Sequence, residues 1–217
     1  MTHQDHNTPR LMTRIVVAAM VILMALPAFA GPPTDFVEVK RKTLEEVVNQ
    51  PVSPKRTENL RKIARELIDY DQLAKRSLGA EWDKLNETGQ KRFVALLEKV
   101  VELNYANRFK EKASTKKYVI KITGEATRGD NSIVKTEISY NDETFTINYK
   151  MMAKDGTFII HDVAFDDVSL QETYRKAYVP IIQKEGWASM FGRISAKCKD
   201  LGGTAAECKA DTNGIMK

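Results

Sequence analysis

The sequence has few of the residues from which metal centres and common catalytic sites are built. Its 217 residues include two cysteines and three histidines. After residue 30 it contains no nucleophile elbow, phosphate-binding loop, zinc-ligand pair or calcium loop. We therefore expect no cofactor, no metal site and no enzyme activity.

Long apolar runs are also missing. The charge-free apolar run Ile15–Leu26 is shorter than the ~20 residues that a transmembrane helix needs. Arg10 and Arg14 precede it and Ala28-Phe29-Ala30 follows, which is the pattern of a secretory signal peptide; a retained N-terminal anchor is the alternative. We predict that residues 1–30 are removed and that the mature chain, with no cysteine at its start for lipid attachment, works outside the cytoplasm.

Neither sign of charge is in strong excess. The chain has 34 Lys and Arg against 29 Asp and Glu, a formal net charge of +5, and the two signs are interleaved. Nucleic-acid binding usually needs a concentrated basic face, so we expect no nucleic acid as a partner. A weak preference for anionic membrane surfaces is compatible with this composition.

Both cysteines lie near the C-terminus, at Cys198 and Cys208, with Gly202-Gly203 between them. In an exported protein an even pair predicts a disulfide, and the glycines give the chain freedom to turn back on itself. No histidine is close enough in sequence to complete a metal site with them. We expect the disulfide to staple a tail, residues 198–217, that lies outside the main core.

Apolar residues recur at helical spacing in the first half of the mature chain. Ser53 and Asn86 stand where they can cap the second and fourth helices, and Gly79 stands where the third ends. The predicted helices are Asp35–Gln50, a second that begins at Ser53-Pro54, Asp71–Leu78 and Glu87–Phe109.

Between residues 117 and 165 the period changes to two, which predicts β-strands. Four alternating segments are joined by short turns such as Gly129-Asp130-Asn131, so they should form an antiparallel meander with one apolar face. A capping box at Ser169 opens a last helical stretch, which Pro180 should kink. The pattern predicts one α+β domain, residues 31–197, with helices on one face of a curved antiparallel sheet of about four strands.

One cluster of side chains could support acid–base chemistry. His161-Asp162 lies in the fourth predicted strand, and Asp166-Asp167 follows it. Three carboxylates near one imidazole could shift one another's pKa and create a general base. In the structural alternative, His161 and Asp162 point to opposite faces of a strand and Asp166-Asp167 forms a surface turn. We favour the structural interpretation, because a lone cluster is weak evidence for catalysis.

Four lysines bracket the end of the long fourth helix. Such runs are usually solvated, but these could also contact an acidic partner or lipid headgroups. They are Lys110, Lys112, Lys116 and Lys117.

Several motifs, in a fixed order, resemble those of one family. The segment Asp69–Trp82 has its aspartate-aromatic pair and its Leu-Gly and Trp positions, and a capped helix with Gln90-Lys-Arg-Phe-Val94 follows. Phe158–Val163 resembles the last long strand of the family. Val168-Ser-Leu170 and Tyr174-Arg175 resemble its capping box and the start of its final helix.

Over residues 35–197 the chain resembles the MlaC family, the periplasmic phospholipid-binding components of the maintenance-of-lipid-asymmetry system. It departs from the family where Phe158 replaces a usual tryptophan, where Asp167 replaces a usual glycine, and in its cysteine-bearing tail. The resemblance implies an NTF2/cystatin-like fold with an apolar cavity between helices and sheet. It also implies a monomeric periplasmic carrier that exchanges phospholipid with an outer-membrane lipoprotein–porin complex and with an inner-membrane MCE-domain ABC transporter.

Within such a carrier, the lipid would lie between apolar stripes of helices and strands that face each other. A filled core would explain the same stripes, so the cavity itself is an expectation from the resemblance. The residues predicted to line it are Leu78, Trp82, Phe93, Leu97, Val100, Ile138, Phe145, Ile147 and Tyr149. Two other functions stay open: an NTF2-like enzyme that uses His161, Asp166 and Asp167, and an interaction protein without a ligand.

Overall fold

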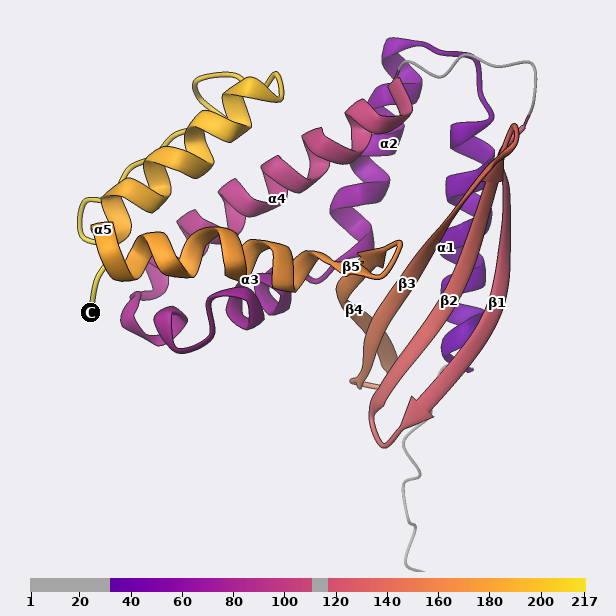
Figure 1. Ribbon diagram of the computed structural model, residues 1–217, viewed down its shortest axis with the longest axis horizontal. Helices are drawn as coiled ribbons and strands as arrows, with labels where there is room; N and C mark the ends of the chain where they lie inside the picture. The colour runs from indigo at the N-terminus through magenta and orange to yellow at the C-terminus, as the bar shows by residue number, and fades with distance from the viewer. Residues whose placement is uncertain (1–31, 111–116) are drawn as a thin grey trace, which may run out of the picture.

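The structure, a computed structural model, describes residues 32–110 and 117–217 (Figure 1). The predicted signal peptide lies outside the described residues. No helix within these two ranges is long and apolar enough to cross a membrane. The elements are α1 (Pro33–Val48), α2 (Pro54–Leu67), α3 (Tyr70–Leu78), the 3-10 helix η1 (Gly79–Lys84), α4 (Glu87–Lys110), β1 (Val119–Arg128), β2 (Asn131–Tyr140), β3 (Glu143–Lys154), β4 (Thr157–Phe165), β5 (Val168–Ser169) and α5 (Leu170–Asp200).

The strands form one antiparallel sheet in the order β1-β2-β3-β4-β5. Side chains of β2 alternate between buried and exposed along its length, because one face of the strand packs against helices and the other faces solvent. The predicted α+β fold with a curved antiparallel sheet is therefore confirmed. The two-residue strand β5, which is too short to show a period, adds a fifth strand to the four that the sequence predicts.

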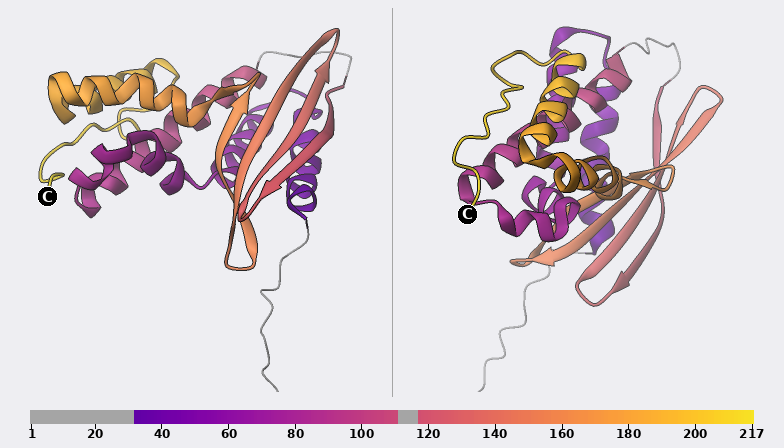
Figure 2. Two further views of the ribbon diagram at one scale, coloured as in Figure 1. Left: turned by 60° about the horizontal axis from the view of Figure 1, so that its bottom comes forward. Right: turned by 60° about the vertical axis from the view of Figure 1, so that its left-hand side comes forward.

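Helices cover the sheet in two groups. α1 contacts β1 and β2 and runs behind the sheet in the view of Figure 1, and α2 packs between α1 and α4. The second group, which we call the helical lobe, consists of α3, η1, the first half of α4, α5 and the C-terminal tail. It projects to one side of the sheet, and α3 and α5 reach β4 (Figure 2). We call α1, α2, the second half of α4 and the sheet the cavity region.

Arg41 on α1 and Asn49, the residue after this helix, pair with the open edge of the sheet at the start of β1. The side-chain amide of Asn49 donates to the Tyr118 carbonyl at 3.1 Å and accepts from the Tyr118 N–H at 2.8 Å. Arg41 Nη1 donates to the Ile120 carbonyl at 2.9 Å. The helix thus satisfies backbone groups that a neighbouring strand would otherwise bind.

The helix starts follow the capping residues. The Ser53 hydroxyl accepts from the Arg56 N–H at 3.1 Å, and the Asn86 side chain accepts from the Gly89 N–H at 3.0 Å. The Ser169 hydroxyl does the same for Glu172 at 3.1 Å. Each bond satisfies one of the free amide groups of a first helical turn. The predicted caps at Ser53, Asn86 and Ser169 are confirmed.

The bend in α5 is at Gly186, and the prediction of a kink at Pro180 is wrong. Pro180 lies within the helix on its exposed side, where the carbonyl that it leaves without a partner can face solvent. Gly186 has φ 84° and ψ 175°, a conformation that is accessible almost only to glycine. The chain changes direction there, so that one long helical segment wraps two sides of α4 (Figure 1).

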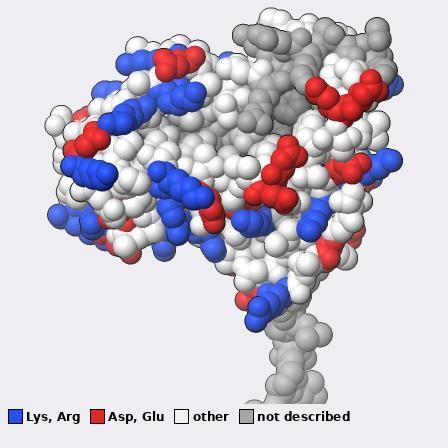
Figure 3. All heavy atoms as spheres, viewed as in Figure 1, with Lys and Arg blue, Asp and Glu red and all other residues white. Residues whose placement is uncertain are grey.

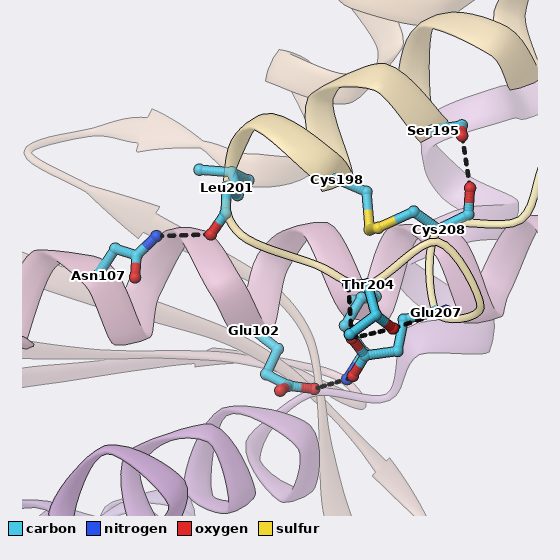
Figure 4. Close-up of a disulfide and its surroundings, with 9 residues drawn as sticks. Glu102, Asn107, Ser195, Cys198, Leu201, Thr204, Glu207 and Cys208 are labelled. Atoms are coloured by element: carbon cyan, nitrogen blue, oxygen red, sulfur yellow. Dashed lines mark hydrogen bonds and ion pairs between the residues drawn. A yellow bond between two sulfur atoms is a disulfide. The ribbon is translucent and has the colours of Figure 1, made fainter. Parts of the chain in front are cut away.

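The C-terminal tail is anchored in the core by three buried residues, Cys198, Cys208 and Ile215. Cys198 and Cys208 form the predicted disulfide, but both are fully buried within the main apolar cluster, so the prediction that the disulfide lies outside the core is wrong. Figure 4 shows how this loop lies on α4. Asn107 donates to the Leu201 carbonyl at 3.0 Å, and Lys99 on α4 lies 3.2 Å from the Glu207 carboxylate. The disulfide itself is therefore buried, whereas most residues of the loop between the two cysteines are exposed.

Candidate ligand-binding cavity

An apolar cavity of about 60 Å³ lies in the cavity region, between α2 and α4 on one side and β3 and β4 on the other. Its lining residues come from five helices and strands and from the residue after α2. They are Leu44, Leu60, Ile63, Ala64, Leu67, Ile68, Val101, Tyr105, Ala106, Ile147, Tyr149, Val163 and Phe165.

Local periodicity places these side chains on one surface. In α2, Leu60, Ile63, Ala64 and Leu67 follow the i, i+3, i+4, i+7 spacing that forms a single stripe. In β3 and β4 the lining residues are two positions apart and so share a face. The cavity therefore forms where an aliphatic helical stripe faces the apolar side of the sheet.

No ionisable group other than tyrosine is among the described residues that line the cavity. Burial raises the pKa of Tyr149 to about 12, so this side chain is neutral at physiological pH. The rings of Tyr105 and Phe165 stack with their centroids 4.4 Å apart. Such a lining favours apolar ligands over water, because a buried water needs two or more polar partners.

The structure does not bring the nine predicted lipid-binding residues together in one place. Ile147 and Tyr149 line the cavity. Leu78, Trp82, Phe93 and Leu97 lie in the core with helices of the helical lobe, where the Phe93 ring meets Tyr178 at 6.2 Å and Phe191 at 6.4 Å. Val100 is buried beside the cavity-lining Val101 but is not in the lining itself, and Ile138 and Phe145 are register partners on β2 and β3. That any of the nine contacts lipid stays a prediction.

The largest group of lining residues that the prediction omitted comes from α2. Its stripe from Leu60 to Leu67 is visible in the sequence as an amphipathic pattern. A stripe shows which face of a helix is apolar, but it does not show which facing surface it meets or whether the space between is filled. The role of Phe165 was harder to predict, because Phe165 ends a strand and the position of its ring depends on the turn that follows.

The predicted lysine cluster is only partly covered by the structure. Lys112 and Lys116 lie outside the described residues, and for Lys110 only the backbone position at the end of α4 is described. Lys117 is exposed. On the face of the molecule in Figure 3, lysines and arginines are spread over the helical lobe with acidic residues between them.

The His161 cluster occupies a junction between the sheet and the helical lobe. Ile160 pairs with Met151 and Asp162 with Lys150, so His161 is the extra residue of a β-bulge. Because of the bulge, both His161 and Asp162 are buried, and the simple alternation of faces that the structural interpretation assumed does not hold. Burial, and next the Arg76 guanidinium, lower the pKa of His161 to about 4. The imidazole is therefore neutral near pH 7.

The carboxylates of this cluster have structural partners. Asp162 accepts from Lys150 Nζ at 2.8 Å, from the Ser169 hydroxyl at 2.6 Å and from the Gln171 N–H at 3.0 Å, and so fastens β4 to the start of α5. Asp166 accepts from the Thr146 N–H at 2.8 Å, and Asp167 accepts from the Asn148 amide at 3.0 Å.

Asp166 and Asp167 form the turn before the last helix. Both have positive φ, 46° and 64°, a conformation that glycine adopts without strain and that aspartate tolerates better than most residues. The replacement of a usual glycine by Asp167 is thus compatible with the turn. Within the described residues, no group of three or more His, Cys, Asp or Glu side chains is arranged to hold a metal ion.

Comparisons with protein families and with solved structures both give matches. A family model described as MlaC protein matches residues 38–196. The fold is similar to a solved structure described as the phospholipid-binding protein from Ralstonia solanacearum in complex with a phospholipid. That match has a TM-score of 0.69 at 12% sequence identity and covers 79% of this chain and 99% of that chain. No curated protein matches the sequence.

Proposed function

Because this chain belongs to the MlaC protein family, we propose that it binds phospholipid through the apolar cavity and carries it without chemical change. The almost entirely apolar lining of the cavity is the observation that carries this proposal. The solved relative is described as bound to a phospholipid, and the shared fold supports the same class of ligand here. Family membership favours binding and transport over catalysis.

The energetics of lipid transfer require a carrier of this kind. Burial of one methylene is worth roughly 0.8 kcal/mol, so two acyl chains with some thirty methylenes would cost on the order of 20 kcal/mol to expose to water. A protein that encloses the chains removes most of this cost. Side chains such as Leu60, Ile63 and Val163 make no directional contacts, so acyl chains of different lengths can occupy the same space.

Acyl chains can enter only if the walls of the cavity separate. Its volume of about 60 Å³ is smaller than that of an engineered cavity of about 150 Å³ that binds benzene. The cavity therefore marks where α2 and α4 part from the sheet when lipid binds. The stacked rings of Tyr105 and Phe165 must move with these walls, because both line the cavity.

We further propose that the protein works in the periplasm. The basic, apolar and small-residue pattern of residues 1–30 supports export, and the disulfide between Cys198 and Cys208 fits an oxidising compartment. In this proposal the carrier exchanges lipid with an outer-membrane lipoprotein–porin complex and with an inner-membrane MCE-domain ABC transporter. The family membership supports both partners.

Organic extraction of the purified mature protein, followed by lipid mass spectrometry, tests the carrier function. We expect phospholipid in near-stoichiometric amount. Ala64→Trp adds bulk to the cavity wall and should strongly reduce it, whereas Ala177→Trp makes the same change on the exposed side of α5 and should not. Wild-type protein that contains no phospholipid, or equal lipid in both variants, would contradict the proposal.

The alternative of an enzyme has its own test. In the carrier, Asp166 and Asp167 only hold the turn before α5, so Asp166→Asn/Asp167→Asn should leave lipid transfer between donor and acceptor vesicles nearly unchanged. Asparagine also tolerates positive φ, so the turn should persist. Conversion of bound phospholipid into a cleaved product, abolished by this double variant, would favour the enzyme instead.

A further inference from the structure

An open apolar groove adjoins the cavity. It has a volume of about 410 Å³, and Leu67 and Ile68 line both the groove and the cavity. Its apolar lining also includes Phe36 from α1, Val94 from α4 and Phe158 from β4, and the two phenylalanine rings meet edge to face at 6.3 Å. The groove therefore collects apolar side chains from α1, α2, α4 and β4 at the surface.

Carboxylates surround this apolar surface. Lys62 Nζ lies 3.8 Å from one of them and Lys154 Nζ lies 3.9 Å from another, but both lysine side chains are more than half exposed, and such pairs are weak in water. No Lys or Arg is among the described residues that line the groove. The acidic residues of the lining are Glu66, Asp69, Asp71 and Glu98.

Among the described residues, no Lys or Arg is paired with Glu98 itself. Burial, and next the neighbouring Glu102 carboxylate, raise its pKa. Arg65 and Lys99 act in the opposite direction, but both are engaged with Glu102, at 3.1 and 2.8 Å. A local surplus of negative charge on a chain with a formal net charge of +5 sets this surface apart from the rest of the protein.

We propose that this surface, the acidic groove, docks a basic amphipathic segment of a partner protein. Apolar side chains of the segment fill the space above Phe36, Val94 and Phe158, while its Lys and Arg side chains pair with the surrounding carboxylates. An anionic membrane surface does not fit, because its phosphates would face four carboxylates. Docking does not require that the cavity hold lipid, so this inference stands apart from the carrier function.

The position of the groove connects docking with the cavity. α2 ends at Leu67. Two residues later, the backbone N–H of Asp69 donates to the Ile160 carbonyl of β4 at 2.8 Å. Leu67 and Ile68 are thus held between the helix and the sheet as a thin wall. A segment that displaces this wall changes the shape of the cavity behind it.

The test uses a synthetic peptide with leucine on one helical face and lysine on the other, about 20 residues long so that it can form a helix. Its affinity for the mature protein is measured by fluorescence anisotropy. The groove variant is Glu66→Gln/Asp71→Asn/Glu98→Gln. Its control, Asp130→Asn/Glu137→Gln/Asp155→Asn, makes the same change in net charge on the sheet and its turns. A further variant, Phe36→Ala, removes apolar surface from the groove without changing charge.

We expect the groove variant to bind the peptide about tenfold more weakly than the wild type, because three partly screened charge pairs are lost. The sheet control should bind the peptide as the wild type does. Phe36→Ala should also weaken binding, and added salt should weaken binding to the wild type more than to the groove variant. Thermal unfolding and the content of copurified lipid are measured for each variant. Normal values for both confirm that a loss of affinity comes from the groove itself.

Several results would overturn the proposal. One is equal loss of peptide binding in the groove variant and the sheet control, which would show non-specific attraction. Another is unchanged binding in Phe36→Ala. Sedimentation with phosphatidylethanolamine or phosphatidylglycerol vesicles that only the groove variant abolishes would assign the groove to a membrane. Self-association that only this variant abolishes would assign it to a second copy of the chain. The carrier function would survive all of these results.

Discussion

The helical lobe and the cavity region bury similar kinds of side chain but pack them differently. In the helical lobe the Phe93 ring is fully buried and lies edge-on to Tyr178 and Phe191. In the cavity region the stripe of α2 faces the apolar side of the sheet across a space of about 60 Å³. Interlocking rings fill one region, whereas small and aliphatic side chains such as Ala64 leave the other partly hollow.

This difference shows that apolar composition alone does not determine whether a region is solid. Close packing depends on whether neighbouring surfaces interdigitate. The helical lobe is closed further by the disulfide and by the tail, where Arg92 donates to the Asn213 carbonyl at 2.8 Å. The cavity region has no disulfide among its described residues and can yield more easily. The proposed carrier function requires both properties, a rigid frame and a wall that opens.

The largest expected effect comes from a truncation in the solid region. Phe93→Ala should lower the free energy of unfolding by about 3–5 kcal/mol, because it removes a buried ring and leaves a cavity. Chemical denaturation measures this change. A loss below about 1 kcal/mol, the usual size for a loosely packed surface position, would show that the helical lobe is not the rigid part.

The disulfide should contribute nearly as much. Its closed loop is short, with a sequence separation of 10, and the loop-entropy relation gives about 3 kcal/mol for such a loop. Cys198→Ala/Cys208→Ala should therefore lower the midpoint of urea unfolding, and lipid binding should persist under native conditions. Free-thiol titration of the unfolded wild-type protein should detect no thiol. Two reactive thiols per chain would show that the bond does not form.

His161 makes the junction between the sheet and the helical lobe sensitive to acid. Its pKa in the folded protein is about 4, below the ordinary value of 6.5, so the unfolded chain binds the proton more readily. The contribution of neutral His161 to the free energy of unfolding is therefore fully present above pH 6.5. It falls by at most about 3 kcal/mol as the pH drops to 4. Unfolding measured across this range should show the fall in wild type and a smaller one in His161→Gln. Equal curves would assign the acid sensitivity to other groups.

The smallest expected effect separates the two regions most directly. Ala74→Leu in the fully buried part of α3 should overpack the helical lobe and cost about 1–3 kcal/mol. Ala64→Leu adds the same atoms to the cavity wall and should change stability by less than about 1 kcal/mol while reducing bound phospholipid. Thermal unfolding and lipid mass spectrometry provide the two measurements. Equal destabilisation by both substitutions would mean that α2 packs as tightly as α3.

Local rules were sufficient to predict most of the fold. Ser53, Asn86 and Ser169 mark helix starts through bonds to their own neighbours, and the fourth predicted strand ends at Phe165 as observed. The bend of α5 was misplaced because the effect of Pro180 depends on whether its unpaired carbonyl can reach solvent. This is a property of the folded surface and does not appear in the periodicity.

The site was harder to predict than the fold. Ile147 and Tyr149 were identified because a strand has only two faces, and one of them had to meet helices. Phe93 shows the same apolar pattern but meets other rings in the helical lobe. The choice between a filled and a hollow contact depends on the fit between residues far apart in sequence, such as Ala64 and Val163.

The side chains of Arg41 and Asn49, which bind the edge of the sheet at β1, also affect how the chain behaves before it is folded. Asn49 and Tyr118 are 69 residues apart, so their contact forms only after a long stretch of chain has been brought together. Until then the edge of β1 can pair with the edge of another unfolded molecule, which is a common beginning of aggregation. Asn49 and Arg41 therefore act as a safeguard of solubility, and their loss should show first as a lower yield of folded protein at high expression.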